Sequence, residues 1–154
     1  MTGTTDSFLL PSALEPNLDQ ILSYWDGLKR GGNDIPFWDD VQLASQERRT
    51  RDLALIEVFE NPLRFRLDMV GEDIMRRYGT VVTGKFLDEI EAKPPLEALA
   101  DQCLASLQRR APSYYRSSDA LFGAQRPGYA RLVMPLWGNG RIEMLLCAAD
   151  FGDS

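Results

Sequence analysis

Residues 63–70, Leu-Arg-Phe-Arg-Leu-Asp-Met-Val, alternate between apolar and charged side chains. The apolar residues fall on the odd positions and the charged residues on the even positions as far as Asp68. Successive side chains of a β-strand point to opposite faces of a sheet, so this period of two predicts a half-buried strand. Helical patterns follow this strand and further strands follow the helices. This order indicates one small curved sheet whose helices gather on one side.

Four other segments are predicted to be strands. Residues 53–60 precede the turn signal Asn61-Pro62, which makes them the hairpin partner of residues 63–70. Three more strands are expected near the carboxyl end, over 113–122, 130–137 and 141–150. Gly138-Asn139-Gly140 between the last two is a strong signal for a tight hairpin. The segments together predict an α+β fold.

An amphipathic helix is predicted to begin at Asn17, a favourable N-cap with Gln20 three residues later as its capping-box partner. Gly31-Gly32 ends it. Its apolar residues recur at helical spacing: Leu18, Ile21, Leu22, Trp25 and Leu28. A stripe of this kind has to be covered. Two compatible covers stay open: the sheet of the same domain, or a partner subunit for which these five residues form the interface.

Three helices are predicted between the second and third strands. The first runs from Glu72 to Tyr78 and ends at Gly79. The second is capped by Thr83 and covers residues 84–90. The third begins at Pro94-Pro95, because proline fits the first turn of a helix. This third helix has an unbroken apolar stripe made of Leu96, Leu99, Ala100, Cys103, Leu104 and Leu107. A helical turn is also expected within residues 41–48.

The chain has 154 residues and a net charge of −6. This length suits one domain with a single core. An acidic chain lacks the basic surface that neutralises phosphates, so we expect no nucleic-acid binding. No apolar run is long enough to span a bilayer, and the amino-terminal residues do not resemble a signal peptide. We therefore expect no membrane span and a cytoplasmic protein.

The sequence contains no histidine. This excludes Ser-His-Asp and Cys-His catalysis, histidine-ligated haem and zinc sites that contain histidine. Cys103 and Cys147 lie in apolar patterns and are expected to be buried reduced thiols, too few for a four-cysteine metal site. The adjacent acids at 39–40, 72–73 and 88–89 point to different sides of a helix and form no catalytic pair by spacing. No metal site and no catalytic residue are predicted.

Several short motifs occur in a characteristic order. They are Pro62 to Leu67, Gly71, Tyr78-Gly79 and Thr83 to Glu89, with Tyr24-Trp25 before them and Met134-Pro135-Leu136 after them. The motifs and the order of elements resemble a family of stand-alone bacterial PAS domain proteins, once described as a domain of unknown function. In that family a Phe-Arg-x-x-x-x-Gly strand leads into a Gly-x-x-x-Thr-Gly-x-x-Leu helix pair. The resemblance covers roughly residues 18–150.

The resemblance implies a five-stranded antiparallel sheet of order 2-1-5-4-3, with helices over one face enclosing a pocket and an N-terminal amphipathic helix. PAS domains of this kind are sensors, or modules for protein interaction and dimerisation in signal transduction. The implied partners are another signalling protein and a second copy of the chain. Haem-binding PAS domains need a histidine, and light-sensing (LOV) flavin domains need an Asn-Cys-Arg-Phe-like helix. Both are missing, so no cofactor is predicted.

Two groups of residues are candidate sites. Arg64 and Arg66 lie on the polar face of their strand, where they either pair with carboxylates such as Glu57 or Asp68, or form a surface for an acidic partner protein. The candidates for lining the pocket are Tyr114, Tyr115, Phe86 and Met134. Tyr114 and Tyr115 point to opposite faces of the third strand, so one of them is expected inside.

The predicted organisation has three parts: a flexible arm over 1–16, the N-terminal helix with a connecting loop over 17–52, and a PAS-like domain over 53–151. The first functional hypothesis is a sensor or adaptor that binds a partner protein. The second is a small-molecule binding protein with an occupied pocket. The third, an enzyme using carboxylates or tyrosine, is the least supported.

Overall fold

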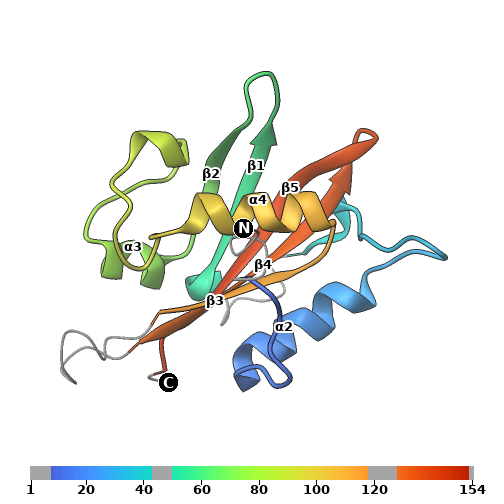
Figure 1. The fold of residues 1–154 in the computed structure, drawn as a ribbon, viewed down its shortest axis with the longest axis horizontal. Helices are drawn as coiled ribbons and strands as arrows, with labels where there is room; N and C mark the ends of the chain where they lie inside the picture. Colours follow the sequence, from blue (N-terminus) through green and yellow to red (C-terminus); the bar gives the residue numbers. More distant parts are fainter. Residues whose placement is uncertain (1–7, 43–49, 118–127, 153–154) are drawn as a thin grey trace, which may run out of the picture.

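The computed structural model of the chain describes residues 8–42, 50–117 and 128–152. It contains one sheet of five strands: β1 (Leu53–Phe59), β2 (Arg64–Val70), β3 (Ser113–Ser117), β4 (Tyr129–Gly138) and β5 (Arg141–Asp150). Figure 1 shows the helix α4 (Leu99–Arg109) crossing in front of these strands. The predicted α+β class is confirmed. The predicted extension of β3 to residue 122 lies outside the described residues.

The strands lie in the order β2-β1-β5-β4-β3, and each pairs antiparallel with its neighbour. This confirms the order that the family resemblance implied. The first strand of the sequence therefore pairs with the last one in the middle of the sheet. The β4–β5 hairpin turns at Asn139 and Gly140, whose φ angles of 51° and 78° suit a two-residue turn with both residues left-handed.

A bulge interrupts the alternation that identified β2. Phe65 and Leu67 point into the core, as predicted. Asp68 is then an extra residue in the register with β1, so the faces exchange beyond it and Met69 packs on the opposite side of the sheet. Leu63 precedes the strand and is 42% exposed. The prediction that the odd positions share one buried face is therefore wrong at Leu63 and Met69.

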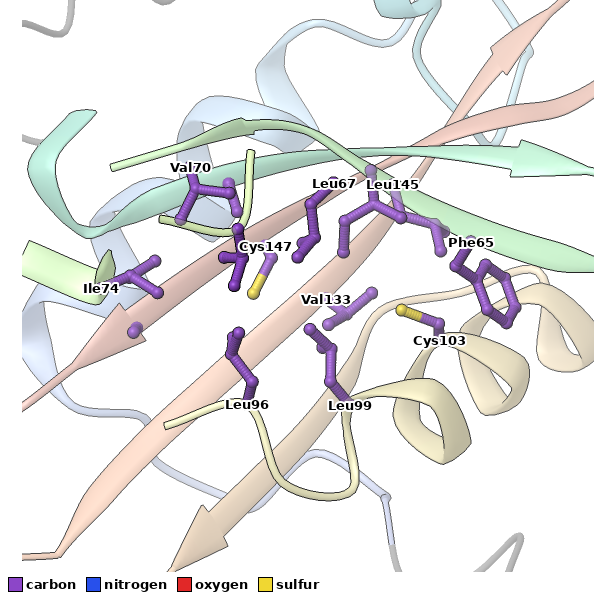
Figure 2. Packing of buried hydrophobic residues seen from close by; sticks show 14 of the residues in the cluster. Phe65, Leu67, Val70, Ile74, Leu96, Leu99, Cys103, Val133, Leu145 and Cys147 are labelled. Carbon is purple, nitrogen blue, oxygen red and sulfur yellow. The ribbon is translucent and has the colours of Figure 1, made fainter. Parts of the chain in front are cut away.

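One hydrophobic core lies between the sheet and α4. Figure 2 shows Leu96 and Leu99 pointing from the chain at the start of α4 toward Cys147 and Val133 of the sheet. The short helix α3 (Glu72–Tyr78) packs at the edge of the same core and ends at Gly79, as predicted. The helices on this face therefore bury the apolar side chains that β1, β2, β4 and β5 direct toward them.

A second hydrophobic core lies on the opposite face of the sheet, beneath α2 (Pro16–Gly27). Leu18, Ile21 and Trp25 of this helix are buried within the chain itself. They pack against side chains of β4 and β5 such as Leu132 and Leu146. The sheet therefore has apolar side chains on both faces, and its own N-terminal helix covers the second one.

The start of α2 differs from the prediction. The helix begins at Pro16 with Glu15 as its N-cap, and no side chain caps it. The capping box expected at Asn17 and Gln20 is therefore wrong. Proline fixes φ at a helical value and has no N–H to satisfy, so Pro16 is a suitable first residue.

The start of α4 also differs from the prediction. Ala98 takes a left-handed conformation, with φ of 58°, so the helix begins at Leu99 rather than at Pro94-Pro95. Leu96 is nevertheless buried, as its place in the apolar stripe predicted. The stripe was right for Leu96, Leu99 and Cys103, wrong for Ala100, which is exposed, and wrong for the helix boundary.

The helix predicted over residues 84–90 is wrong apart from a single turn, η4 (Leu87–Glu89). The preceding residues form a turn, in which the Lys85 amide donates to the Val82 carbonyl (3.1 Å) and Gly84 has a φ of 87°. This turn is bonded to β2: the Leu67 amide donates to the Lys85 carbonyl (2.8 Å), the Gly84 amide donates to the Leu67 carbonyl (2.6 Å), and Phe86 forms an isolated bridge with Arg66. Two further short turns are η1 (Trp38–Asp40) and η3 (Thr50–Asp52). Most of the turn expected within 41–48 lies outside the described residues.

Candidate functional site

The four residues expected to line a pocket are not brought together. Tyr114 packs on the α2 side of the sheet and Tyr115 on the α4 side, so the prediction of opposite faces holds. Met134 is fully buried beneath α2. Phe86 lies at the β2 edge, with its ring centroid 5.2 Å from that of Phe59. Of the four, Tyr115 is the one beside the polar cluster described below.

The residues expected at an interface belong mostly to the second core. Leu18, Ile21 and Trp25 are buried against the sheet, while Leu22 and Leu28 are half-buried. The sequence left two alternatives open for burying this apolar stripe, the sheet of the same domain and a partner subunit. Within the chain, the sheet is the one that buries it. Leu22 and Leu28 retain exposed surface that a second subunit can reach.

Arg64 and Arg66 are both engaged by carboxylates of their own chain. Arg66 lies 2.7 Å from Glu57 and 2.6 Å from Asp68. Arg64 lies 2.7 Å from Asp88, with its guanidinium carbon 3.8 Å from the centroid of the Phe86 ring. Of the two alternatives predicted for these arginines, pairing with carboxylates of the same chain is the one that the structure contains. The other alternative was a surface for an acidic partner protein.

Five of the six adjacent acids, all except Asp39, form ion pairs with arginines, and one of the five, Asp73, also lies close to another carboxylate. Asp52, in η3, lies near Asp73 of α3. Burial, followed by the negative charge of Asp73, raises the pKa of Asp52 to about 6. Two further charges act on the pKa of Asp52: Arg77 lowers it and Asp150 raises it. The raised pKa of Asp52 makes the pair a pH-dependent structural element of the fold.

Both cysteines are buried free thiols, as predicted. Burial raises the pKa of Cys147 to about 11, and it raises the pKa of Cys103 further. The thiolate is the nucleophilic form of cysteine, so neither side chain is set up to react at neutral pH.

The most unusual feature of the interior is a buried polar cluster between α4, β3 and β4, centred on Arg131. Arg131 is only 1% exposed. Its Nε donates to Oε1 of Gln102 (2.7 Å), and its Nη1 donates to the carbonyl oxygen of Pro95 (2.8 Å). Gln102 lies on α4 and in turn donates its amide to the backbone carbonyls of Ser113 (3.1 Å) and Arg131 (3.0 Å). The guanidinium is thus held by neutral oxygens.

Two serines complete the link between α4 and the sheet. The hydroxyls of Ser106 and Ser113 are 2.6 Å apart, and Ser106 also donates to the carbonyl oxygen of Val133 (3.0 Å). Both side chains are fully buried. Buried polar groups that bond one another fix the packing of the elements that carry them. The position of α4 over β3 and β4 therefore depends on this network.

Aromatic side chains surround Arg131 on its other side. Tyr115, opposite Arg131 in the β3–β4 register, has its ring centroid 4.7 Å from the guanidinium carbon. The Tyr115 hydroxyl donates to Glu97 (2.9 Å), and its ring lies 6.2 Å from that of Tyr129. Burial raises the pKa of the Tyr129 phenol well above its usual value, so this hydroxyl is a donor at neutral pH.

Two atoms of the cluster lack a hydrogen-bond partner within the described part of the chain: Nη2 of Arg131 and the hydroxyl of Tyr129. Both residues are buried, and both belong to the α4 side of β4, two positions apart. A desolvated donor without an acceptor costs free energy, and a charged donor costs more. The carboxylate of Glu97, which also raises the pKa of Tyr129, is an acceptor that the chain itself places close to that hydroxyl, so Nη2 of Arg131 is the more clearly unsatisfied donor of the two.

No prediction included this cluster, although signals for it are present in the sequence. Arg131 is the one charged residue in the otherwise apolar run Ala130 to Trp137, and Gln102 is polar at a position where α4 faces the sheet. Alternation along β4 also places Tyr129 on the same face as Arg131. What the sequence could not indicate is that Gln102 and Arg131, 29 residues apart, bond one another.

Over residues 8–42, 50–117 and 128–152, no group of three or more acidic or cysteine side chains is placed to hold a metal ion. Within the same ranges, no helix is long and apolar enough to cross a membrane. No protein-family model matches the chain, and no curated protein sequence matches it significantly.

Proposed function

We propose that this protein is a sensor module of the PAS type that binds a small polar molecule in its interior and passes the signal to a partner protein. The observation that carries the proposal is the buried guanidinium of Arg131, whose Nη2 has no hydrogen-bond partner among the described residues and which lies on the same face of β4 as Tyr129. A small molecule with a carboxylate or carbonyl oxygen would satisfy both donors. The strand order β2-β1-β5-β4-β3 and the motifs in the sequence support the assignment to the PAS type.

The contacts of Arg131 suggest how binding would change the surface. Arg131 bonds Gln102 directly, and Gln102 lies on α4. A ligand that draws the guanidinium toward itself weakens this bond, which helps to hold α4 on the sheet. A ligand shifts a conformational equilibrium by its difference in affinity for the two states. The proposed output is therefore a change in the position of α4 that a partner protein reads.

We also propose the coarser features that the sequence predicted: a cytoplasmic, non-enzymatic protein that forms homodimers. Leu22 and Leu28 on the outer part of α2 are the residues of the predicted interface that keep exposed surface. Substitution of each by glutamate is expected to leave the fold intact and to reduce the mass measured by light scattering from that of a dimer to that of a monomer. An unchanged mass would remove α2 from the interface.

The ligand proposal is tested by denaturing the freshly purified protein and identifying released small molecules by mass spectrometry. We expect a molecule bearing a carboxylate or carbonyl group, in near-stoichiometric amount. Tyr129→Phe removes only a hydroxyl, so it should fold normally and release much less of the molecule. Tyr114→Phe is the matched control on the opposite face, where the hydroxyl bonds Glu15 (2.9 Å), and it should retain the ligand.

One combination of results would contradict the ligand proposal. A folded protein that releases no small molecule, with a water bridging Arg131 and Tyr129 in a crystal structure, would overturn the ligand proposal. An adaptor that binds its partner without a small molecule would then be the better explanation.

A further inference from the structure

Residues 8–15, which precede α2, form a strap that is bonded at both ends to β3, the strand at one edge of the described sheet. At the first end, the Tyr114 amide donates to the carbonyl oxygen of Phe8 (3.0 Å). At the second end, the carboxylate of Glu15 accepts hydrogen bonds from the hydroxyl of Tyr114 (2.9 Å) and from Nη1 of Arg116 (2.7 Å). Because β4 pairs with the inner edge of β3, the Phe8 end of the strap lies at the outer edge.

Phe8 is the one buried residue of this strap. It is 5% exposed, whereas the next two residues, Leu9 and Leu10, are 57% and 40% exposed. The Phe8 ring centroid lies 6.2 Å from that of Tyr115, which packs on the α4 side of the sheet. The strap is thus held by one buried ring and by the bonds at its ends. A segment with so few buried contacts can open while the rest of the fold stays intact.

Tyr115 connects the strap to the buried guanidinium of Arg131. Its ring contacts Phe8, and its ring centroid lies 4.7 Å from the guanidinium carbon of Arg131. Arg131 is also the partner of Tyr115 in the β3–β4 register. Phe8, Tyr115 and Arg131 therefore form a row across the strap, β3 and β4. The Tyr115 ring covers one side of the guanidinium, and Phe8 packs against that ring.

The position of the Tyr115 ring depends on two contacts besides Arg131. Its hydroxyl donates to Glu97 (2.9 Å), and its ring packs against Phe8. A rotation that uncovers Arg131 has to break the first contact and needs free space beside the ring. Phe8 fills space beside the ring while the strap is closed, so departure of Phe8 gives Tyr115 room to turn.

We propose that the strap is the gate of the interior site at Arg131. A small molecule reaches the guanidinium when Phe8 leaves the outer edge of β3 and the Tyr115 ring turns away from Arg131. This inference rests on the ligand site proposed above and adds the route by which that site is reached. The strap opens by losing one buried ring and one backbone hydrogen bond among the described residues, and the five-stranded sheet stays paired.

Hydrogen exchange followed by nuclear magnetic resonance on the whole chain tests the gate, with water as the probe. The Nε–H of Arg131 is buried and bonded to Gln102, so it exchanges with solvent when the site opens. Phe8→Ala removes the ring that packs against Tyr115. The variant should speed this exchange at least about tenfold, because protection reports the free energy of the local opening. Leu9→Ala is the matched control at the exposed neighbour and should leave the rate unchanged.

Low concentrations of urea distinguish opening of the strap from global unfolding. The strap exposes little surface when it opens, so exchange of the Arg131 Nε–H in the native chain should hardly depend on urea. The backbone amide of Leu145, fully buried in the central strand β5, should instead exchange by global unfolding and respond steeply to urea. Equal urea dependence of the two signals would overturn the gate, and so would unchanged exchange in Phe8→Ala.

The mass spectrometry described above decides separately whether a small molecule is bound. A released molecule together with unchanged exchange in Phe8→Ala would overturn the strap as the gate and keep the ligand at Arg131. Accelerated exchange in Phe8→Ala with no released molecule would overturn the ligand and keep the strap as the cover of the Arg131 cluster. The two proposals therefore fail on different measurements.

Discussion

Trp25 donates its indole N–H to the carbonyl oxygen of Pro135, 2.8 Å away, although the two residues are 110 positions apart in the sequence. Pro135 lies on β4 beyond Val133, the last residue of β4 that pairs with β3. A helix side chain thus supplies the partner for a carbonyl oxygen at a place where the neighbouring strand has ended. The N-terminal helix is tied to the sheet by a directed bond as well as by apolar contact.

Trp25→Ala should destabilise the protein by about 3–5 kcal/mol, because it leaves a cavity in the second core and an unpaired buried carbonyl. Trp25→Phe keeps most of the apolar contact and should cost less. Urea denaturation followed by circular dichroism measures both. If Trp25→Ala instead altered only the oligomeric mass and left the midpoint unchanged, the packing of α2 on its own sheet would be refuted.

Arg66→Ala should leave the fold intact and lower the stability only slightly at neutral pH, because the side chain of Arg66 is 35% exposed and its ion pairs are screened by solvent. The variant leaves Glu57 and Asp68 facing one another without a cation. Burial and Asp68 already raise the pKa of Glu57, so the cost should shrink at mildly acidic pH, where Glu57 takes up a proton. Unfolding by urea at two pH values checks this, and loss of the fold would contradict the surface position of Arg66.

Asp52→Asn should change how stability depends on pH. The pKa of Asp52 is about 6 in the folded protein and 3.8 ordinarily, so the folded state binds more protons between about pH 4 and pH 6. The free energy of unfolding therefore falls as the pH rises through this window, by at most about 1.4 kcal/mol per pH unit and by less after solvent screening. Asp52→Asn should remove this slope and be more stable than the native chain at pH 7.

Asp40→Asn is the matched control for Asp52. Its hydrogen bonds from Arg30, of 2.6 and 2.7 Å, hold the pKa of Asp40 below its usual value, so its contribution is present at neutral pH and lost as the pH falls. The two variants should therefore shift the pH profile in opposite directions. A profile of Asp52→Asn identical to that of the native chain would show that Asp52 titrates normally.

Gly71→Ala should be strongly destabilising. A Cβ at this position would overlap the backbone carbonyl oxygens of Thr50 and Arg51, because η3 passes directly over the start of α3. Overpacking against backbone costs about 1–3 kcal/mol. Gly27→Ala, where nothing lies within 4 Å of the added atom, should instead stabilise α2 by up to about 1 kcal/mol. Equal melting temperatures for the two variants would contradict this close approach.

The sequence predicted the elements well where a single local rule decided the outcome. The Asn139-Gly140 turn, the end of α3 at Gly79 and the strands on either side of Asn61 follow from residues that readily adopt a positive φ, which turns and helix ends require. Predictions failed where a contact distant in the sequence decided. The segment around Lys85 looks helical from its own residues but forms a turn that is bonded to Leu67 of β2.

The candidate sites were harder to predict for the same reason. Tyr115 was identified as a pocket residue from its place on β3, but its significance depends on Arg131, which faces it across the sheet register. A periodic pattern reports which face a residue occupies and says nothing about which polar atoms remain without a partner there. That property emerges only when Gln102 and Pro95 are seen to satisfy two of the guanidinium nitrogens and leave the third.

The Phe37–Trp137 bridge has a consequence for the behaviour of the protein at high concentration. β4 has ten residues and its outer neighbour β3 only five, so part of β4 would form an open edge able to recruit a strand from another molecule. The Trp137 amide is instead occupied by the carbonyl of Pro36, within a segment whose proline cannot extend a ladder. At Trp137 the chain therefore occupies a backbone donor that a strand from another molecule would otherwise need for pairing.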